Sequence, residues 1–384
     1  MATTKGQVIR CKAVVAWEKE QPLSIEEIEV EAPKAHEVRI KIIATGVCHT
    51  DISGWKGILP YTRFPAVLGH EAAGIVESVG TGVTFCKEGD HVMPIFLPQC
   101  QKCQVCKSPD KNICDKFMVP PEKVGFMSDG TTRMTCKGKK LHHFLGTSTY
   151  SEYTVVDESQ VVKINKDAPL DKVCILSCGV STGYGAPIKI AKEKPGSTCA
   201  VFGLGTVGLG AVMGCRAQGA KRIFGIDINN DKKEIAKTLG VTDFINPKEL
   251  GKPIHEVLIA ETNGGCDSTY ECIGNPDLIK SALYACKPVG GQSIVVGVPA
   301  QGKTVTFDPY NLLYGRVWTG EFYGGFKPKD DLPGLVEDYM KKKIMLDEFI
   351  TSTMAIEDIG KSIELVLQGK ATKIVLYFKP NFVI

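Results

Sequence analysis

The sequence predicts an α/β protein with two domains: a β-rich, barrel-like first domain and a second domain in which strands and helices alternate. Its 384 residues are enough to build two hydrophobic cores. The N-terminal part has short apolar runs separated by Gly and Pro, and within 38–42 apolar and charged side chains alternate as in a half-buried strand. Beyond residue 180, runs of strand length alternate with helix-like runs, which is typical of a parallel sheet with crossover helices.

The elements of the first domain follow from these short apolar runs. We expect strands at 7–16, 36–46, 72–79 and 150–156, and the start of a helix at 170–174. Residues 116–150 are expected to be irregular, because Gly125, Gly130 and Gly138 mark turns there.

The second domain begins near Cys178, where the pattern of the sequence changes. We expect its strands at 198–202, 222–226, 267–271, 293–297 and 317–322, with a helix that runs to Ala217. After Gly324-Gly325, helices are expected at 331–343 and 356–368, and a strand at 373–378 returns to the first domain. The predicted domains are therefore 1–179 with 323–384, and 180–322.

Composition excludes several classes of function. The net charge of +3, without a dense Lys/Arg arm, predicts no nucleic-acid partner. No apolar run reaches the roughly 18 residues of a membrane span, and the N-terminus has no signal-peptide core. We therefore expect a cytoplasmic protein. In that reducing compartment, the 15 cysteines favour metal ligation over disulfides.

A cysteine-rich segment within 95–115 predicts a structural metal lobe. Four cysteines follow the pattern C-x2-C-x2-C-x7-C, at Cys100, Cys103, Cys106 and Cys114. Two-residue gaps let successive sulfurs converge on one ion, and four thiolates fill a tetrahedral zinc shell. Iron–sulfur ligation uses similar gaps and stays an alternative, although no ferredoxin-like context follows. The alternative without a metal is that these are free cysteines in a loop.

A second group of soft ligands predicts a catalytic metal site. Cys48-His49-Thr50-Asp51 and Gly69-His70-Glu71 lie close together in the sequence, and Cys178 lies far downstream, just before a glycine-rich turn. Two thiolates and one imidazole leave one coordination position open, as in catalytic zinc sites. We expect this site at the hinge between the domains.

A glycine-rich turn predicts a dinucleotide site in the second domain. Gly203, Gly205 and Gly208 form G-x-G-x-x-G between an expected strand and an expected helix, and Asp227 follows the last glycine by 19 residues. The glycines would allow close approach of the pyrophosphate to the helix N-terminus. Asp227 would accept hydrogen bonds from the ribose hydroxyls and repel a 2′-phosphate, which favours NAD over NADP. A glycine turn without a ligand is the alternative.

Together these motifs resemble the zinc-containing alcohol dehydrogenases of the medium-chain dehydrogenase/reductase family, of the liver type, from end to end. The resemblance rests on the two ligand runs, the four-cysteine lobe, Ser177-Cys178-Gly179, Gly203–Gly208 and Asp227. It implies a GroES-like catalytic domain and a Rossmann domain with a doubly wound parallel sheet. It also implies an enzyme of the EC 1.1.1.1 type, with two zinc ions per subunit, that oxidises alcohols reversibly with NAD, as a homodimer joined near 310–321.

The resemblance assigns a role to each matching residue. Cys48, His70 and Cys178 would bind the catalytic zinc, with Asp51 orienting His70 and Glu71 behind the metal. Thr50 would hold the substrate hydroxyl, and Phe96 would line the substrate channel. The remaining residues would bind the cofactor: His49 and Lys373 at the pyrophosphate, Lys232 at the adenosine ribose, Ile273 at the adenine, and Thr182 and Val207 at the nicotinamide. Val296 and Val298 are further expected cofactor contacts.

Two departures from the family pattern keep alternatives open. Many members have a proton-relay histidine where this chain has Ser53, and the Cys-His-Thr-Asp-x-Ser pattern favours the class II branch. Serine does not titrate near neutral pH, so Ser53 could at most order a water molecule. Met118 stands where the glutathione-dependent formaldehyde dehydrogenases have an arginine, which counts against that activity. A non-catalytic structural protein on the same fold is the third interpretation. The preferred alcohol or aldehyde cannot be predicted.

Overall fold

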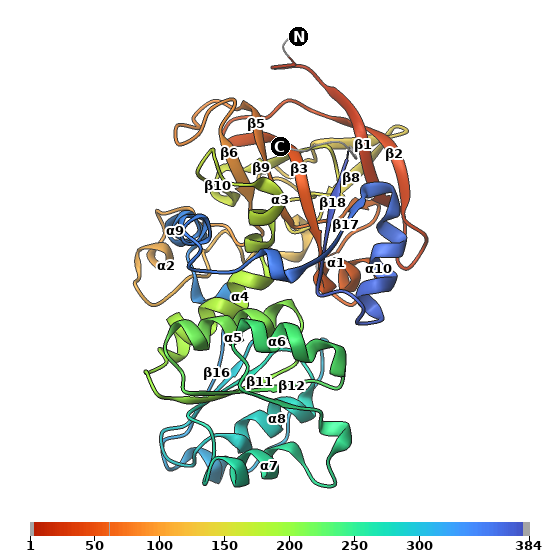
Figure 1. The fold of residues 1–384 in the computed structure, drawn as a ribbon. Coiled ribbons are helices and arrows are strands. Elements are labelled where there is room, and N and C mark those ends of the chain that lie inside the picture. The colour runs from red at the N-terminus through yellow and green to blue at the C-terminus, as the bar shows by residue number, and fades with distance from the viewer. Residues whose placement is uncertain (1–3, 61, 379–384) are drawn as a thin grey trace. The chain divides into compact units, whose positions relative to one another are not determined.

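The structure is a computed structural model that describes residues 4–60 and 62–378. The chain divides into two compact units, Met1–Cys178 with Lys327–Ile384, and Gly179–Phe326 (Figure 1). Each unit is described by itself.

The first unit is built from two sheets. One is a closed barrel in the order β1-β2-β7-β8-β4, and the other has the order β10-β6-β5-β3-β18-β17, with β9 also paired to β3. The strands are β1 (Ile9–Ala16), β2 (Ser24–Val30), β3 (Glu37–Val47), β4 (Ala66–Val67), β5 (Glu71–Val79), β6 (His91–Pro94), β7 (Met134–Cys136), β8 (Lys139–His143), β9 (Tyr153–Asp157), β10 (Val161–Lys163), β17 (Ile350–Ala355) and β18 (Lys373–Tyr377).

Strand β3 connects the parts of this unit. Ten of its eleven residues are buried, and it pairs with β5, β9 and β18. Because β18 comes from the C-terminal segment, this pairing brings that segment into the first unit. The helices of the unit are α1 (His49–Trp55), α2 (Gln104–Lys107), α3 (Leu170–Val173), α9 (Pro328–Met340) and α10 (Ile359–Leu367).

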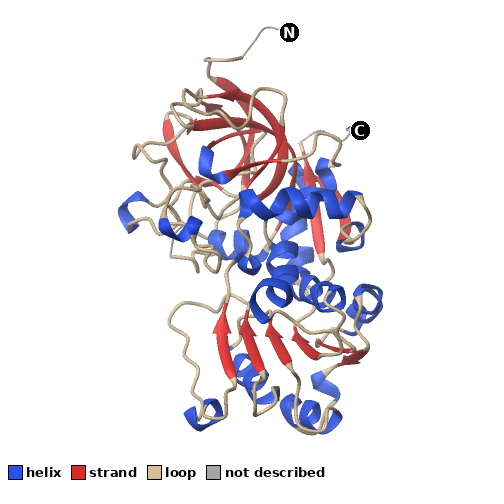
Figure 2. Ribbon diagram, turned by 90° about the vertical axis from the view of Figure 1, so that its left-hand side faces the viewer, coloured by secondary structure: helices blue, strands red, loops and turns tan. Residues whose placement is uncertain are grey.

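The second unit is a six-stranded parallel sheet in the order β13-β12-β11-β14-β15-β16. Its strands are β11 (Thr198–Phe202), β12 (Arg222–Ile226), β13 (Asp243–Ile245), β14 (Ser268–Glu271), β15 (Gln292–Val295) and β16 (Val317–Gly320). Its helices are α4 (Gly179–Gly185), α5 (Thr206–Ala217), α6 (Lys233–Leu239), α7 (Ile254–Glu261) and α8 (Pro276–Ala285). They cover both faces of the sheet (Figure 2).

This strand order confirms the predicted doubly wound sheet. The order reverses between β11 and β14, and in such sheets the ligand crevice lies at the carboxyl ends of the strands at this switch point. The glycine-rich turn follows β11 directly, so the fold places it at that point.

The expectation that 116–150 is irregular is wrong. This segment contains the hairpin β7–β8, which turns at Lys137 and Gly138, both with positive φ. Such a two-residue turn is usually signalled by Asn-Gly or Asp-Gly. The strands are also only three and five residues long, with exposed lysines at the start of β8. They form because they close the barrel between β2 and β4, which is a long-range effect.

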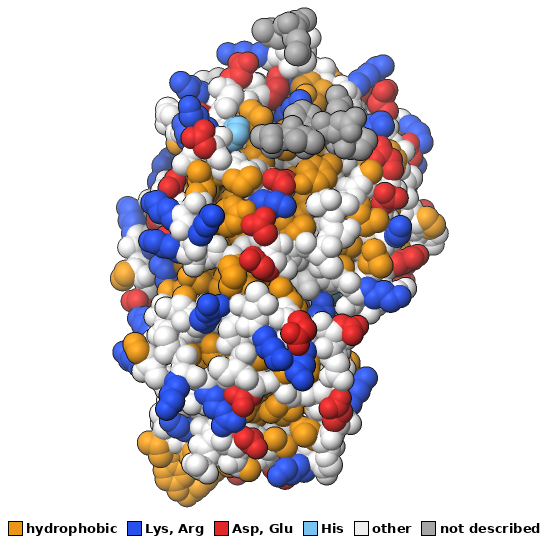
Figure 3. Space-filling view, viewed as in Figure 1, with side chains coloured by type: hydrophobic (Ala, Val, Ile, Leu, Met, Phe, Trp, Pro, Cys, Tyr) orange, Lys and Arg blue, Asp and Glu red, His pale blue; other side chains and the backbone are white. Residues whose placement is uncertain are grey.

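Charged side chains of both signs are interspersed over the face shown in Figure 3. Among the described residues, no single helix is long and apolar enough to cross a membrane. Only the bent pair Leu170–Ser177 and Gly179–Ala191 passes that test, and only when its two segments are taken together.

Candidate functional site

The first candidate site begins at the N-terminus of helix α1. Cys48 is the N-cap residue, with an extended backbone (φ −126°, ψ 152°), and the carboxylate of Asp51 accepts a hydrogen bond from the Cys48 backbone N–H at 3.1 Å. This is one half of a capping box, and a negative charge in the first turn is favourable. The same run of residues therefore starts the helix and fixes the position of Asp51.

Asp51 lies at the centre of a buried hydrogen-bond network. One carboxylate oxygen accepts from Nδ1–H of His70 at 2.7 Å, and the other accepts from the hydroxyl of Tyr150 at 2.9 Å. All three residues are at most 2 % exposed. With its proton held on Nδ1 by Asp51, His70 presents the lone pair of Nε2 on its other side. Among the described residues, this buried Nε2 has no hydrogen-bond partner of ordinary geometry, although the side chains of His70 and Cys48 interact.

This nitrogen lies within a set of metal-binding groups. Ligand atoms of Cys48, His70, Glu71 and Cys178 all lie within 4.8 Å of one another. The Cys178 thiol, which hydrogen-bonds to the sulfur of Cys48, lowers the pKa of Cys48 well below its usual range against the effect of burial, and the same contact raises the pKa of Cys178. A divalent cation would hold both sulfurs as thiolates. Two thiolates and one oriented imidazole are a donor set that suits catalytic zinc.

Glu71 and Lys373 form a buried ion pair beside these ligands. Nζ of Lys373 donates to Glu71 Oε2 at 2.6 Å and to the carbonyl of Val47 at 3.2 Å. Burial raises the pKa of Glu71 to about 7, and Lys373 works against this increase. A Cβ at Gly46 would lie only 2.4 Å from Glu71 Oε2, which explains the glycine there.

Lys373, which was predicted at the pyrophosphate, is only 1 % exposed, and its amine contacts Glu71 at the candidate metal site. Its contact with a pyrophosphate stays a prediction. His49, the other predicted phosphate contact, is exposed at the first residue of α1. Thr50 and Ser53 are half-buried on the same helix.

Two aromatic rings flank His70. Phe96 and Phe144 contact the imidazole edge-on, with centroid distances of 5.7 and 6.1 Å. A Cβ at Gly54 would lie 2.5 Å from the Phe144 ring, so α1 also packs against it. Phe96 was predicted, but sequence reasoning missed Phe144 and Tyr150. Phe144 precedes the strand expected at 150–156, and Tyr150 begins it. No local sequence pattern shows that Phe144 contacts His70 or that Tyr150 contacts Asp51.

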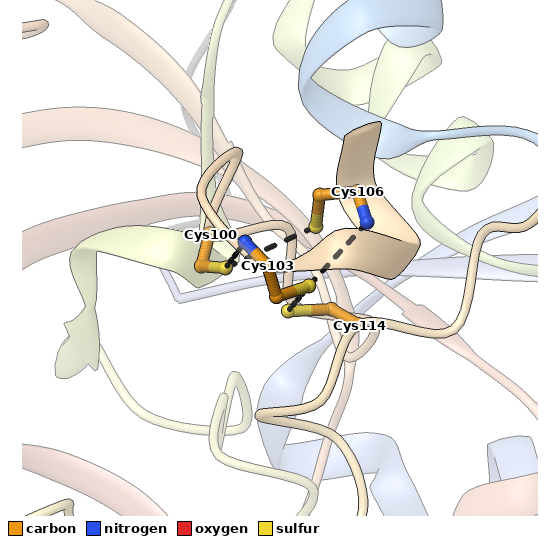
Figure 4. Close-up of side chains that lie close together, drawn as sticks. All are labelled: Cys100, Cys103, Cys106 and Cys114. Atoms are coloured by element: carbon orange, nitrogen blue, oxygen red, sulfur yellow. Dashed lines mark hydrogen bonds between the residues drawn. The ribbon is translucent and has the colours of Figure 1, made fainter. Parts of the chain in front are cut away.

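The four cysteines of the lobe converge as expected (Figure 4). Two sulfur pairs, Cys100–Cys106 and Cys103–Cys114, are each 3.9 Å apart. Zn–S bonds of about 2.3 Å place the sulfurs of a regular tetrahedron about 3.8 Å apart. Backbone N–H groups of Lys102 and Cys103 point at the sulfur of Cys100, at 3.5 and 3.4 Å. The geometry and chemistry of this donor set fit a zinc ion.

Helix α9 holds the lobe in place. Nζ of Lys327 donates to the carbonyls of Cys106, at 2.9 Å, and Ser108. Asp330 accepts hydrogen bonds from the side chains of Gln99, at 2.7 Å, and Gln101, at 3.1 Å. These contacts join the lobe to a helix more than 200 residues later in the chain.

The second candidate site is the glycine-rich turn after β11. Gly203 has φ +88°, and a Cβ there would meet Ile273 at 2.4 Å. A Cβ at Gly208 would lie 1.7 Å from the carbonyl oxygen of Gly203. Gly205 differs, because a Cβ there would have no described atom within 4 Å outside its chain neighbours. Intramolecular packing thus explains Gly203 and Gly208 but not Gly205, which leaves room for a ligand.

The residues predicted around this turn lie near one another. Asp227 accepts hydrogen bonds from the backbone N–H of Leu204, at 2.7 Å, and of Asn229, at 2.8 Å. Burial lowers the pKa of Lys232, and the nearby charge of Asp227 opposes this.

Other residues predicted to bind the cofactor lie close to the glycine-rich turn or to residues next to it. Ile273 contacts Gly203, and a Cβ at the adjacent Gly274 would meet the carbonyl of Val298 at 2.4 Å. Thr182 lies in α4 next to Gly183, and a Cβ at Gly183 would lie 1.8 Å from the carbonyl oxygen of Val207. Helix α4 therefore packs closely against the start of α5. Val296 follows β15 directly and is buried. The arrangement fits a nicotinamide dinucleotide, whose phosphates would lie against Gly205, the glycine of the turn that packing does not explain.

Comparisons with known proteins agree with both sites. The family model described as alcohol dehydrogenase GroES-like domain matches residues 34–166, and the one described as zinc-binding dehydrogenase matches residues 206–339. An alcohol dehydrogenase zinc-binding domain protein from Burkholderia ambifaria is 32% identical, with a TM-score of 0.90, covering 97% of this chain and 100% of that one.

Two further solved structures are similar over nearly the whole chain. Benzyl alcohol dehydrogenase from Acinetobacter calcoaceticus is 31% identical, with a TM-score of 0.89, covering 97% of this chain and 100% of that one. The 2R,3R-butanediol dehydrogenase from Bacillus subtilis is 23% identical, with a TM-score of 0.73 and the same coverage, and shows likeness of fold alone.

Proposed function

Because this chain belongs to the zinc-binding medium-chain dehydrogenase family, a family of oxidoreductases, we propose that it oxidises alcohols to aldehydes or ketones, reversibly, by hydride transfer to NAD. The observation that carries the proposal is His70. Asp51 holds its Nδ1 proton, and its buried Nε2 has no described partner of ordinary geometry although two thiols and a carboxylate surround it. An unsatisfied buried polar atom costs about 1–3 kcal/mol. At His70 two thiols and a carboxylate also converge on this nitrogen, and a structural protein without a metal would have no reason to keep that combination.

Each residue of the candidate metal site has a separate role in the proposed oxidation of the alcohol. Zinc, when bound to Cys48, His70 and Cys178, supplies a Lewis acid that lowers the pKa of a hydroxyl group. The hydroxyl of Thr50 relays the proton of the substrate hydroxyl, because it takes up that proton as it releases its own. Ser53, one turn along α1, orders a water molecule that carries the proton onwards. Phe96 and Phe144 exclude water around His70.

The lobe is proposed to hold a second zinc ion, with a purely structural role. Its four thiolates leave no open coordination position, and the contacts of Lys327 and Asp330 make it part of the scaffold of the first unit. The Ser53 pattern supports a member of the liver type that resembles class II.

NAD is proposed over NADP because of Asp227. Its carboxylate is held against the glycine-rich turn by two backbone hydrogen bonds, and it keeps lone pairs for ribose hydroxyls. A 2′-phosphate would bring like charges together at this point.

A homodimer is proposed through the edge strand β16. This strand has one neighbour in the described sheet, and the exposed residues on and before it include Tyr310, Leu313, Tyr314 and Val317. Light scattering on the purified protein checks the proposal, and a monomer at micromolar concentration would contradict it.

The experiment that tests the function is a panel of primary and secondary alcohols, aldehydes and S-hydroxymethylglutathione, assayed with NAD and NADP. We expect alcohol oxidation with NAD, and loss of cofactor preference by about tenfold or more in Asp227→Asn, which keeps the side-chain size but loses the charge. No turnover of any alcohol by the zinc-loaded protein would contradict the function. An unchanged cofactor preference in the variant would contradict the role of Asp227.

A further inference from the structure

The loop between α7 and β14 contains an asparagine that belongs to neither proposed site. Asn263 is followed by Gly264, and both residues are exposed to solvent. No other asparagine of the sequence precedes a glycine. An asparagine in this position can form a cyclic imide with the next residue, because glycine has no side chain to keep its backbone nitrogen away from the asparagine side chain.

The side chain of Asn263 is also free to turn. Among the described residues, it has no hydrogen-bond partner. Asn275 is a contrast, because its side-chain oxygen accepts from the backbone N–H groups of Asp277, at 2.9 Å, and Leu278, at 3.2 Å. The other asparagines with a side-chain hydrogen bond are Asn165, Asn229, Asn230, Asn246 and Asn311. Asn263 therefore combines the reactive sequence with an unrestrained side chain.

The related pair Asp129-Gly130 shows how contacts can restrain such a side chain. The carboxylate of Asp129 accepts hydrogen bonds from Nζ of Lys34, at 2.7 Å, from the guanidinium of Arg133, at 2.9 Å, and from the backbone N–H of Thr131, at 3.0 Å. The carboxyl group has to break these bonds before it can turn towards the nitrogen of Gly130. Asn263 has no such bonds to break.

The backbone nitrogen of Gly264 has one restraint. Its N–H donates to the carbonyl of Ile259 at 2.9 Å, near the exposed end of α7. A Cβ at Gly264 would meet no described atom within 4 Å outside its chain neighbours, so there is room for the loop to rearrange. Helix ends also fray more readily than helix centres. Opening this single hydrogen bond lowers the reactive population by about tenfold or less.

We propose that Asn263 is a site of spontaneous deamidation and isomerisation. The backbone nitrogen of Gly264 loses its proton and attacks Cγ of Asn263. The new C–N bond closes a five-membered imide, the bond from Cγ to Nδ2 breaks, and ammonia leaves with the proton. Water then opens the ring at one of its two carbonyl groups and gives aspartate or isoaspartate. No electrons are transferred, and the isoaspartyl form carries a free α-carboxylate that an isoaspartyl methyltransferase can modify.

Isomerisation has a consequence for the fold that deamidation alone lacks. Isoaspartate adds one methylene to the backbone just before a tightly packed segment, where a Cβ at Gly265 would lie 2.7 Å from the backbone of Cys286. This packing fixes the chain at the start of β14, so Gly264 and the last turn of α7 have to accommodate the extra atom. The isoaspartyl form should therefore melt below the wild type. Asn263→Asp, an exposed substitution, should melt within about two degrees of it.

The test follows the purified full-length protein at neutral pH and physiological temperature over several weeks. Peptide mass spectrometry measures the conversion of each asparagine, and an isoaspartyl methyltransferase with labelled S-adenosylmethionine measures isoaspartate. We expect Asn263 to convert at least about tenfold faster than any other asparagine, and faster still at higher pH, because the attacking nitrogen must lose its proton. Asn263→Gln is the matched control. Its longer side chain closes the imide ring far more slowly, so the methylation signal should disappear.

A parallel sample in urea gives the rate for the unfolded chain, in which the pair is unrestrained. The folded protein should convert Asn263 within about tenfold of that rate, because one hydrogen bond restrains it. If Asn263 converts in urea but stays an amide in the folded protein, the fold protects it and the proposal is wrong. Faster conversion of another asparagine, or a methylation signal that Asn263→Gln retains, overturns the proposal as well.

Discussion

At the scale of single residues, Asp51 connects local structure to the metal site. Its carboxylate caps α1, orients His70 and accepts from Tyr150, so one side chain both starts the helix and sets which imidazole nitrogen is available. A ligand oriented in this way needs no rearrangement when a metal binds.

The first prediction concerns this network. Asp51→Asn keeps the size of the side chain but removes the charge that holds the Nδ1 proton of His70. We expect zinc affinity at this site to fall about 10–100-fold, as chelator competition would measure, while the lobe keeps its zinc. Tyr150→Phe is the matched control, because it removes a neighbouring hydrogen bond to Asp51 and leaves the contact with His70. Equal losses in both variants would show that orientation of His70 is not the cause.

The second prediction concerns His143, a buried histidine outside both sites. Its Nε2 accepts from the backbone N–H of Arg133 at 3.2 Å, and burial lowers its pKa to about 3 from 6.5. Since the folded-state pKa is depressed, only the unfolded chain takes up this proton between these values. Stability is therefore lost as pH falls below about 6.5, by up to about 1.4 kcal/mol per pH unit from this group.

His143→Gln keeps an acceptor but cannot titrate. Urea unfolding of wild type and variant between pH 7.5 and 5 should give curves that converge as the pH falls, because the wild type loses stability faster. Curves that stay parallel over this range would show that His143 is not buried in its neutral form.

Sequence reasoning at the residue scale identified side chains that share a short motif. Cys48, His70 and the four lobe cysteines were found because ligand chemistry favours these residue types in short motifs. The role of Asp51 was implied by the resemblance to the family. Tyr150 and Phe144 could not be found, because their contacts with Asp51 and His70 depend on how the barrel closes. The contact between Lys373 and Glu71 is of the same kind, since 302 positions separate the two residues.

At the scale of elements, the glycines in the turn from β11 to α5 have different roles, some in packing and one in ligand binding. Its first and last glycines are required by neighbouring atoms, whereas Gly205 is not. We predict that two alanine substitutions in this turn change different properties, one the melting temperature and the other the affinity for NADH. Gly208→Ala should lower the melting temperature by several degrees, because the new Cβ would overlap the carbonyl of Gly203.

Gly205→Ala should melt within about one degree of the wild type but bind NADH at least about tenfold more weakly, because its Cβ occupies the space left for the phosphates. Thermal melts and fluorescence titrations check the two variants side by side. Normal NADH binding by Gly205→Ala would remove the turn from the cofactor site.

The elements that could be predicted have strong local patterns. Strands β11 and β12 and the end of α5 match their predicted bounds, because apolar runs, glycines and helix periodicity agree there. The β7–β8 hairpin could not be predicted, because its strands are only three and five residues long and their other pairing partners are the distant strands β2 and β4.

At the scale of the whole molecule, one compact unit carries the candidate metal sites and the other carries the candidate cofactor site. The first unit contains every residue of both candidate metal sites, and the second contains the glycine-rich turn and Asp227. The family assignment follows from both, since its two family models match one segment chiefly in each unit. The alcohol itself could not be predicted, because the pocket is shaped by side chains outside any motif.

The most direct test of the central claim is a zinc count joined to a turnover assay, on the wild type and on His70→Ala. We predict two zinc ions per chain and NADH formation from at least one alcohol for the wild type. His70→Ala should keep one zinc, in the lobe, stay folded and form no NADH. Full activity in His70→Ala, or a zinc-replete wild type that oxidises no alcohol, would contradict the account.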